Sequence, residues 1–76
     1  MIDESEKARM RVEVRRVLRS LVQEAQRQGC LEEVCRFPDV FAAFALLDPV
    51  IGEAVRRELV SLDDVVVWLA VLVSQA

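Results

Sequence analysis

The chain has 76 residues, 54% of them apolar, and a formal net charge of −3. This length allows one small domain, residues 1–76, and the apolar content is far above that of disordered or linker sequences. The mildly acidic balance gives no general electrostatic attraction to nucleic acid or to an anionic membrane. The chain contains no histidine and no tyrosine, so it lacks the commonest general base, the commonest metal ligand and the phenolic acid.

Features near both ends predict a cytoplasmic protein without a membrane segment. Residues 1–7 are charged and lack the apolar stretch of a secretory signal. The apolar run 65–73 is far shorter than the roughly 20 residues needed to span a bilayer. Cys30 and Cys35 lie five residues apart, which separates them around a helix and supplies only two of the four ligands of structural zinc. We expect no disulfide, metal or cofactor, and at least one cysteine packed in the core.

Residues 3–28 are predicted to form one long amphipathic helix. Acidic residues crowd its start, where the helix dipole is positive, and Gly29 suits the left-handed position just past its end. The apolar residues of this segment recur at intervals of three or four and define one stripe. The stripe consists of Met10, Val14, Val17, Leu18, Leu21, Val22 and Ala25.

A short helix is predicted over residues 30–36. The residue before a proline avoids helical geometry, so Phe37 marks a boundary before Pro38. The side chains of this short helix that are expected to turn inward are Leu31, Val34 and Cys35.

Asp39 is expected to cap the next helix, residues 40–47, which has almost no polar face. Phe37, Phe41 and Phe44 follow helical spacing and make one aromatic stripe. A stripe of this kind is typical of a core, although a slot for an apolar ligand is conceivable. We therefore expect the three rings to be buried.

Two further helices complete the chain. Asp48 can cap the fourth, with Pro49 at its first position, and this helix is expected to run to residue 59 or 60. Ser61 opens the fifth, whose apolar run 65–73 leaves only a narrow polar strip. A helix of this kind has to be enclosed on most sides, either by the fold or by a partner.

Glu58 falls within the inward arc of the fourth helix. We expect it to lie at a rim or in an ion pair rather than to act as a buried catalytic acid, because no nucleophile, base or metal set accompanies it. The other members of that arc are Ile51, Ala54, Val55 and Leu59.

These segments predict an all-α bundle of about five helices, with a long first helix, short middle helices and an apolar last helix. Three of the segments are short, and two of them are apolar nearly all round. The chain therefore carries more apolar surface than a bundle of its size encloses, and we expect it to associate with itself or with another protein.

The first helix also carries an arginine ridge, formed by Arg11, Arg15 and Arg19, beside the apolar Leu18 and Val22. The ridge has no acid three or four positions away on its own helix, so it can bind carboxylates of a partner. Alternatively, the ridge faces water or meets acids of the same chain. Those candidate acids are Asp48, Asp63 and Asp64.

The sequence thus favours a non-enzymatic protein-interaction module, such as an adaptor, an inhibitor or an assembly factor, with no small-molecule substrate. Its expected contact residues are the arginine ridge, Leu18 and Val22, joined by Trp68 and Val71 of the last helix. The alternative is a small regulator that binds nucleic acid through the arginine face, which lacks the broad basic field that such binding needs.

Overall fold

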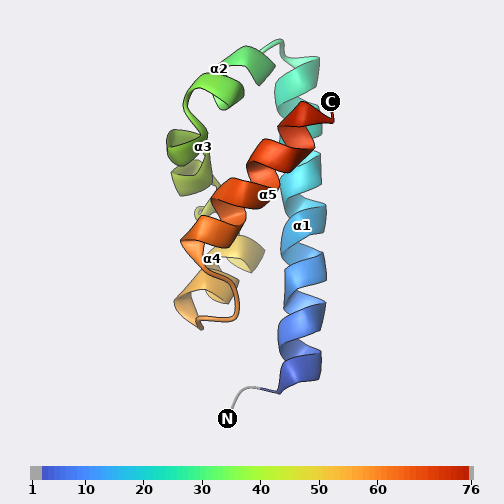
Figure 1. Cartoon of the computed structure of the whole chain (residues 1–76), viewed down its shortest axis with the longest axis vertical. Helices are drawn as coiled ribbons and strands as arrows, with labels where there is room; N and C mark the ends of the chain where they lie inside the picture. Colours follow the sequence, from blue (N-terminus) through green and yellow to red (C-terminus); the bar gives the residue numbers. More distant parts are fainter. Residues whose placement is uncertain (1–2, 76) are drawn as a thin grey trace.

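The computed structural model describes residues 3–75, and within them it contains five α-helices and no strand. The helices are α1 (Glu4–Arg27), α2 (Leu31–Arg36), α3 (Pro38–Ala45), α4 (Pro49–Arg56) and α5 (Leu62–Ser74). The predicted all-α bundle is therefore confirmed over this part of the chain, and Met1, Ile2 and Ala76 lie outside the described residues. The molecule measures 42 × 18 × 18 Å, and α1 follows its long axis (Figure 1).

Helix α5 holds the bundle together. It packs against α1, α2 and α3, while α4 packs against α1. In Figure 1, α5 crosses in front of α1, and the short helices α2, α3 and α4 lie along one side of α1. Every helix and the turn before α5 supply buried apolar side chains. These are Val14, Leu18, Val22, Val34, Ala42, Ala45, Ile51, Ala54, Leu59, Val60, Val65 and Leu69.

Side-chain caps fix the starts of two helices as predicted. The Asp48 carboxylate accepts hydrogen bonds from the backbone N–H groups of Val50 at 2.8 Å and Ile51 at 3.3 Å. Ser61 and Asp64 form a capping box, in which each side chain accepts from the other residue's backbone N–H. Each such cap satisfies amides that a helix start would leave without partners.

Helix α3 begins earlier than predicted. Its first residue is Pro38, and Asp39 lies in the first turn instead of capping it. The physical reason is that proline, with its fixed φ and missing N–H, fits the first helical position. Phe37 ends α2 and precedes α3, as the boundary before a proline requires.

Helix α4 ends at Arg56, three or four residues before the predicted end. Glu58 takes a left-handed conformation with φ of 61°, and the N–H of Leu59 donates to the carbonyl of Ala54 at 2.9 Å. This bond and that from Glu58 N–H to Val55 make a Schellman turn, the same ending that Gly29, with φ of 77°, gives to α1. The turn carries Glu58 out of the inward arc and into solvent, so its side chain is exposed.

Several side chains predicted to be internal are not. Leu21 of α1 is 42% exposed, and Cys35 of α2 is exposed while Cys30 is half-buried. In α5 only Val65 and Leu69 are buried, so the fold does not enclose this helix on most sides. The reason is the brevity of α2 and α3, which cover one side of α5 only.

Candidate protein-interaction surface

The arginine ridge lies against α5. Arg11 donates to the Asp64 carboxylate at 3.4 Å, and its guanidinium carbon lies 4.9 Å from the ring centroid of Trp68. The guanidinium carbon of Arg15 lies 5.4 Å from the same centroid. At these distances the cations are attracted to the ring face. Asp64, one of the acids proposed to meet the ridge, is thus its partner within the chain.

Arg19, the last residue of the ridge, has no ion-pair partner among residues 3–75, and neither has Arg15. Both line a shallow hollow of about 200 Å³ between α1 and α5, together with Trp68 and Val71. With Arg11 over the same Trp68 ring, the structure brings together five of the seven residues predicted to contact a partner.

Leu18 and Val22, the predicted neighbours of the ridge, lie in the core and are 0% and 4% exposed. Val22 shares a hollow with Arg19 of the ridge, but both apolar residues offer little surface to a partner. Instead, they form the inner wall of an apolar cleft that the sequence did not reveal.

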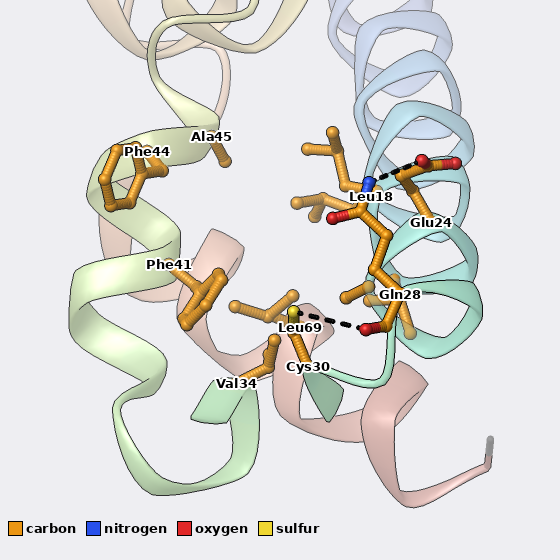
Figure 2. Close-up of a pocket in the computed structure, with 12 residues that line it drawn as sticks. Leu18, Glu24, Gln28, Cys30, Val34, Phe41, Phe44, Ala45 and Leu69 are labelled. Atoms are coloured by element: carbon orange, nitrogen blue, oxygen red, sulfur yellow. Dashed lines mark hydrogen bonds between the residues drawn. The ribbon is translucent and has the colours of Figure 1, made fainter. Parts of the chain in front are cut away.

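This cleft has a volume of about 350 Å³ and lies between α1 and α3. One wall includes Leu18 and Leu21 of α1, and the other includes Phe41 and Phe44 of α3. Leu69 of α5 lies between the two walls (Figure 2). Polar groups are confined to the rim, where the Gln28 amide donates to the Glu24 carboxylate at 2.8 Å. The size and the apolar lining of this cleft are suitable for the apolar face of a helix or for an apolar ligand.

Helix α3 buries two alanines and exposes large residues. Its buried residues are Ala42 and Ala45, which bring the helix close to α5. Four large exposed residues in and directly beside this helix follow a spacing of three, four and three, and we call them the α3 stripe; Phe37 and Leu47 flank the helix, while Val40 and Phe44 share one of its faces. The α3 stripe consists of Phe37, Val40, Phe44 and Leu47, which are 51%, 50%, 61% and 80% exposed.

The expectation that the three phenylalanines are core residues is therefore wrong for Phe37 and Phe44, whereas Phe41 packs against the core. Phe37 and Phe44 are exposed, and Phe41 is half-buried with its ring centroid 6.2 Å from that of Phe44. The spacing of Val40 and Leu47 with Phe37 and Phe44 was visible in the sequence as a signal. This spacing does not distinguish core from surface, because a short helix with almost no polar face does not indicate which of its sides is buried.

The outer side of α5 forms a second exposed apolar face. Val67 and Val71 are 58% and 47% exposed. Leu69 faces the cleft, and Val67 and Val71 each lie two residues away from it along the helix. Two residues correspond to a rotation of about 200°, so both valines point away from the cleft. We call this surface the α5 face. Its exposed residues are Val67, Ala70, Val71 and Ser74.

Unpaired charges lie beside both faces. Asp39, which lies beside the α3 stripe, is exposed and belongs to no ion pair among residues 3–75. The α5 face borders Arg15 and Arg19, and it also carries the exposed Asp63, one helical turn before Val67.

Other ion pairs have structural roles. Arg57 donates to Glu6 at 2.7 Å and ties the end of α4 to the start of α1. On α4 the hydrogen bond from Arg56 lowers the pKa of the Glu53 carboxyl below its ordinary value, and the positive charge of Arg56 acts in the same direction. These exposed pairs contribute little individually.

Residues 3–75 contain no disulfide and no evident metal site. Both cysteines are free thiols, and no group of three potential metal ligands occurs there. None of the described helices is both long and apolar enough to cross a membrane. The chain matches no protein-family model, no curated protein and no solved structure. Function therefore has to be argued from the two exposed faces and the cleft.

Proposed function

We propose that this chain is a non-catalytic protein-interaction module that docks an apolar helical surface into the cleft and against the α3 stripe. The observation that carries the proposal is the exposure of the α3 stripe, whose four large apolar residues are at least half exposed while Ala42 and Ala45 are buried. Hydrophobic stabilisation scales with the apolar area removed from water, so the residues of the α3 stripe contribute little to this fold and much to a complex.

The extent of the surface agrees with a docking role. From their exposed fractions, the four residues of the α3 stripe present roughly 400 Å² to solvent, which is within the range of functional patches on small proteins. The cleft adjoins this stripe through Phe44 and adds a concave part. Aromatic residues beside a concave apolar surface are typical anchors of protein interfaces.

The nucleic-acid alternative remains a lesser proposal. Asp64 partly neutralises Arg11, and Trp68 occupies one side of both Arg11 and Arg15, which leaves Arg19 as the least engaged residue of the ridge. One or two free arginines give a weak attraction to a phosphate backbone. A cytoplasmic location likewise stays a prediction.

A photo-crosslinking experiment tests the docking proposal. A photoreactive phenylalanine analogue would replace Phe44, and in a matched protein it would replace Leu62, which is 44% exposed and lies outside both the cleft and the α3 stripe. We expect the probe at Phe44 to form a discrete adduct with a protein, and the adduct to disappear when Val40 is changed to Glu. The adduct would then be reconstituted from purified components.

The proposal would be wrong if the probe at Phe44 labelled no more protein than the probe at Leu62. It would also be wrong if Val40→Glu left the adduct unchanged, because Val40 is central to the α3 stripe. Circular dichroism of each variant would establish that the helices are retained.

A further inference from the structure

A second hollowed surface follows the line where α5 crosses α1 (Figure 1). Three shallow hollows of about 250, 200 and 350 Å³ make up this surface, and Arg19 lines all three. Arg19 lies two residues before Leu21, a residue of the cleft, so the two side chains are about 200° apart around α1. The surface and the cleft therefore open in different directions. We call this surface the arginine groove. Its central lining consists of Val12, Arg15, Arg16, Arg19, Trp68 and Val71.

Every charged residue that lines the arginine groove is an arginine. Arg15 and Arg19 form no ion pair among residues 3–75. Arg16 pairs with Glu13 at 3.4 Å, but both side chains are well exposed, so this pair is weak and can be exchanged for another. The groove is therefore a local concentration of positive charge on a chain whose net charge is −3.

The acids at the start of α5 do not neutralise the arginine groove. Asp64 is engaged with Arg11 at 3.4 Å. Asp63 is exposed and lies five residues before Trp68, which is about 140° around α5, so it points away from the arginines. An anion in the groove thus meets arginines without a facing carboxylate.

Trp68 holds one of these arginines in place. The guanidinium carbon of Arg15 lies 5.4 Å from the ring centroid, and its Nε donates to the carbonyl of Arg11 at 3.4 Å. The two terminal nitrogens of Arg15 form no ion pair within residues 3–75. A planar guanidinium that is already positioned loses less conformational entropy when it pairs with a carboxylate.

Exposed apolar side chains lie between and beside the arginines. Val12 is 49% exposed and lines the same hollow as Arg16, one helical turn further along α1. Val71 is 47% exposed and shares a hollow with Arg15 and Arg19. A surface of this composition is complementary to a segment that carries both carboxylates and apolar side chains.

The same composition disfavours nucleic acid as the occupant. Single strands bind through bases stacked on aromatic rings, and Trp68, the only aromatic residue that lines the arginine groove, already stacks with Arg11 and Arg15. A duplex requires a broad basic field, which a chain with net charge −3 does not provide.

We infer that the arginine groove binds an acidic amphipathic helix of another protein. Its carboxylates pair with Arg15, Arg16 and Arg19, and its apolar side chains pack against Val12 and Val71. The groove follows α1 from Val12 to residue 26, about 21 Å, which accommodates roughly four turns of a helix. Carboxylates three or four residues apart on such a helix share one face and so reach neighbouring arginines together.

A defined peptide tests this inference. The probe is a labelled helical peptide without tryptophan, in which glutamates three and four residues apart alternate with leucines. We expect fluorescence anisotropy to show binding with a dissociation constant below about 1 mM at low salt, weakening as salt screens the charges. The same peptide with glutamine in place of every glutamate should bind at least tenfold more weakly. Because the chain's single tryptophan lines the groove, the bound peptide should also shift the emission of Trp68.

Two variants of equal charge locate the binding site. Arg16→Gln with Arg19→Gln removes one paired and one unpaired arginine of the groove and should weaken binding at least fivefold. The control, Arg9→Gln with Arg27→Gln, removes one paired and one unpaired arginine of the same helix outside the groove and should stay within twofold. All four arginines are exposed and glutamine is a good helix former, so both variants should keep the fold.

Four outcomes would overturn the inference. Equal weakening by the groove variant and the control would mean general attraction to positive charge. Binding that leaves the emission of Trp68 unchanged would place the peptide elsewhere on the molecule. Tighter binding of single-stranded DNA of the same charge, lost in the Arg16→Gln and Arg19→Gln variant, would assign the groove to phosphates. The absence of any binding up to about 1 mM peptide would exclude an acidic helix as the occupant.

Discussion

Glu58 stores conformational strain at the end of α4. Its φ of 61° lies in the left-handed region, where the Cβ of any residue other than glycine is crowded. The Schellman turn requires this conformation, because the amides of Glu58 and Leu59 both donate back into α4. Gly29 meets the same requirement at the end of α1 without a Cβ.

Glu58→Gly should therefore raise the free energy of unfolding by about 0.5–1 kcal/mol, the relief of strain less the entropy cost of glycine. Urea unfolding followed by circular dichroism measures this change. Glu58→Ala, which removes the charge but keeps the Cβ, is the control and should bring no such gain. An equal gain from alanine would mean that charge, not backbone strain, limits stability at this position.

Gly52 illustrates a different constraint on a single residue. A Cβ built at this position would lie 2.5 Å from the carbonyl oxygen of Leu46, a backbone atom that cannot rotate away. The absent side chain lets α4 approach the turn that follows α3.

Gly52→Ala should lower the free energy of unfolding by about 1–2 kcal/mol, although alanine is the better helix former, because the forced shift outweighs the gain in helix propensity. Chemical denaturation gives the difference directly. A more stable Gly52→Ala protein would show that α4 and Leu46 are farther apart than the structure has them.

At the scale of the element, α1 and α5 are joined by cations stacked on an indole. Arg11 and Arg15 both lie over Trp68, and Arg11 also reaches Asp64 at the start of α5. This contact joins two helices of the same chain, so Arg11 and Arg15 stabilise the fold whether or not the arginine ridge also binds a partner.

Changing Arg11 and Arg15 to Gln should lower the free energy of unfolding by about 1–2 kcal/mol, because each stacked cation contributes about 0.5–1 kcal/mol. It should also shift the fluorescence of Trp68, the chain's single tryptophan, to longer wavelength as water reaches the ring. The matched control is Arg9→Gln with Arg16→Gln, which alters the same helix and charge at exposed positions away from Trp68 and should leave both readouts nearly unchanged. If the control shifted them equally, charge in general would be responsible rather than stacking.

The number and order of the helices followed from the sequence because their ends are chemically marked. The side chains of Asp48 and Ser61 accept hydrogen bonds from backbone amides two or three residues later and so mark helix starts. Gly29 marks the end of α1 because it adopts a positive φ without strain. The end of α4 was missed because Glu58 has no such mark, and the left-handed turn there is imposed by the packing of Leu59 and Val60 into the core.

The candidate surface was predicted only in part. The ridge and Trp68 were found because spacing on one helix and a single tryptophan are visible in the sequence. The cleft was missed because it depends on how far α3 stands from α1, a distance set by Ala42 and Ala45 against α5. In a helix with almost no polar face, the sequence alone does not reveal that the alanines are inside.

On the scale of the whole molecule, apolar surface exceeds what the fold can bury. Nine large apolar side chains among the described residues are exposed. They cluster on the α3 stripe and the α5 face more than elsewhere, and the cleft adds a concave apolar region.

An environment-sensitive apolar dye should therefore bind the native protein at low concentration. Val40→Ser with Phe44→Ser should reduce the dye fluorescence at least twofold while leaving the melting temperature within about 2 °C, because surface changes rarely alter stability by more than about 0.5 kcal/mol. Leu62→Ser is the control and should retain the dye signal. A large fall in melting temperature would show that the α3 stripe is part of the core.

The contact between α1 and α5 also governs how the chain reaches its structure. The first and last helices meet only after the intervening residues have closed a long loop, whose entropy cost rises slowly with length. Val14, Leu18 and Val22 are the buried side chains that α1 supplies, and they pack against the core formed by the rest of the chain. The first helix therefore has no core of its own, so opening the backbone in the turn at Gly29 should yield an N-terminal fragment that is unfolded alone and becomes helical only on binding the C-terminal fragment.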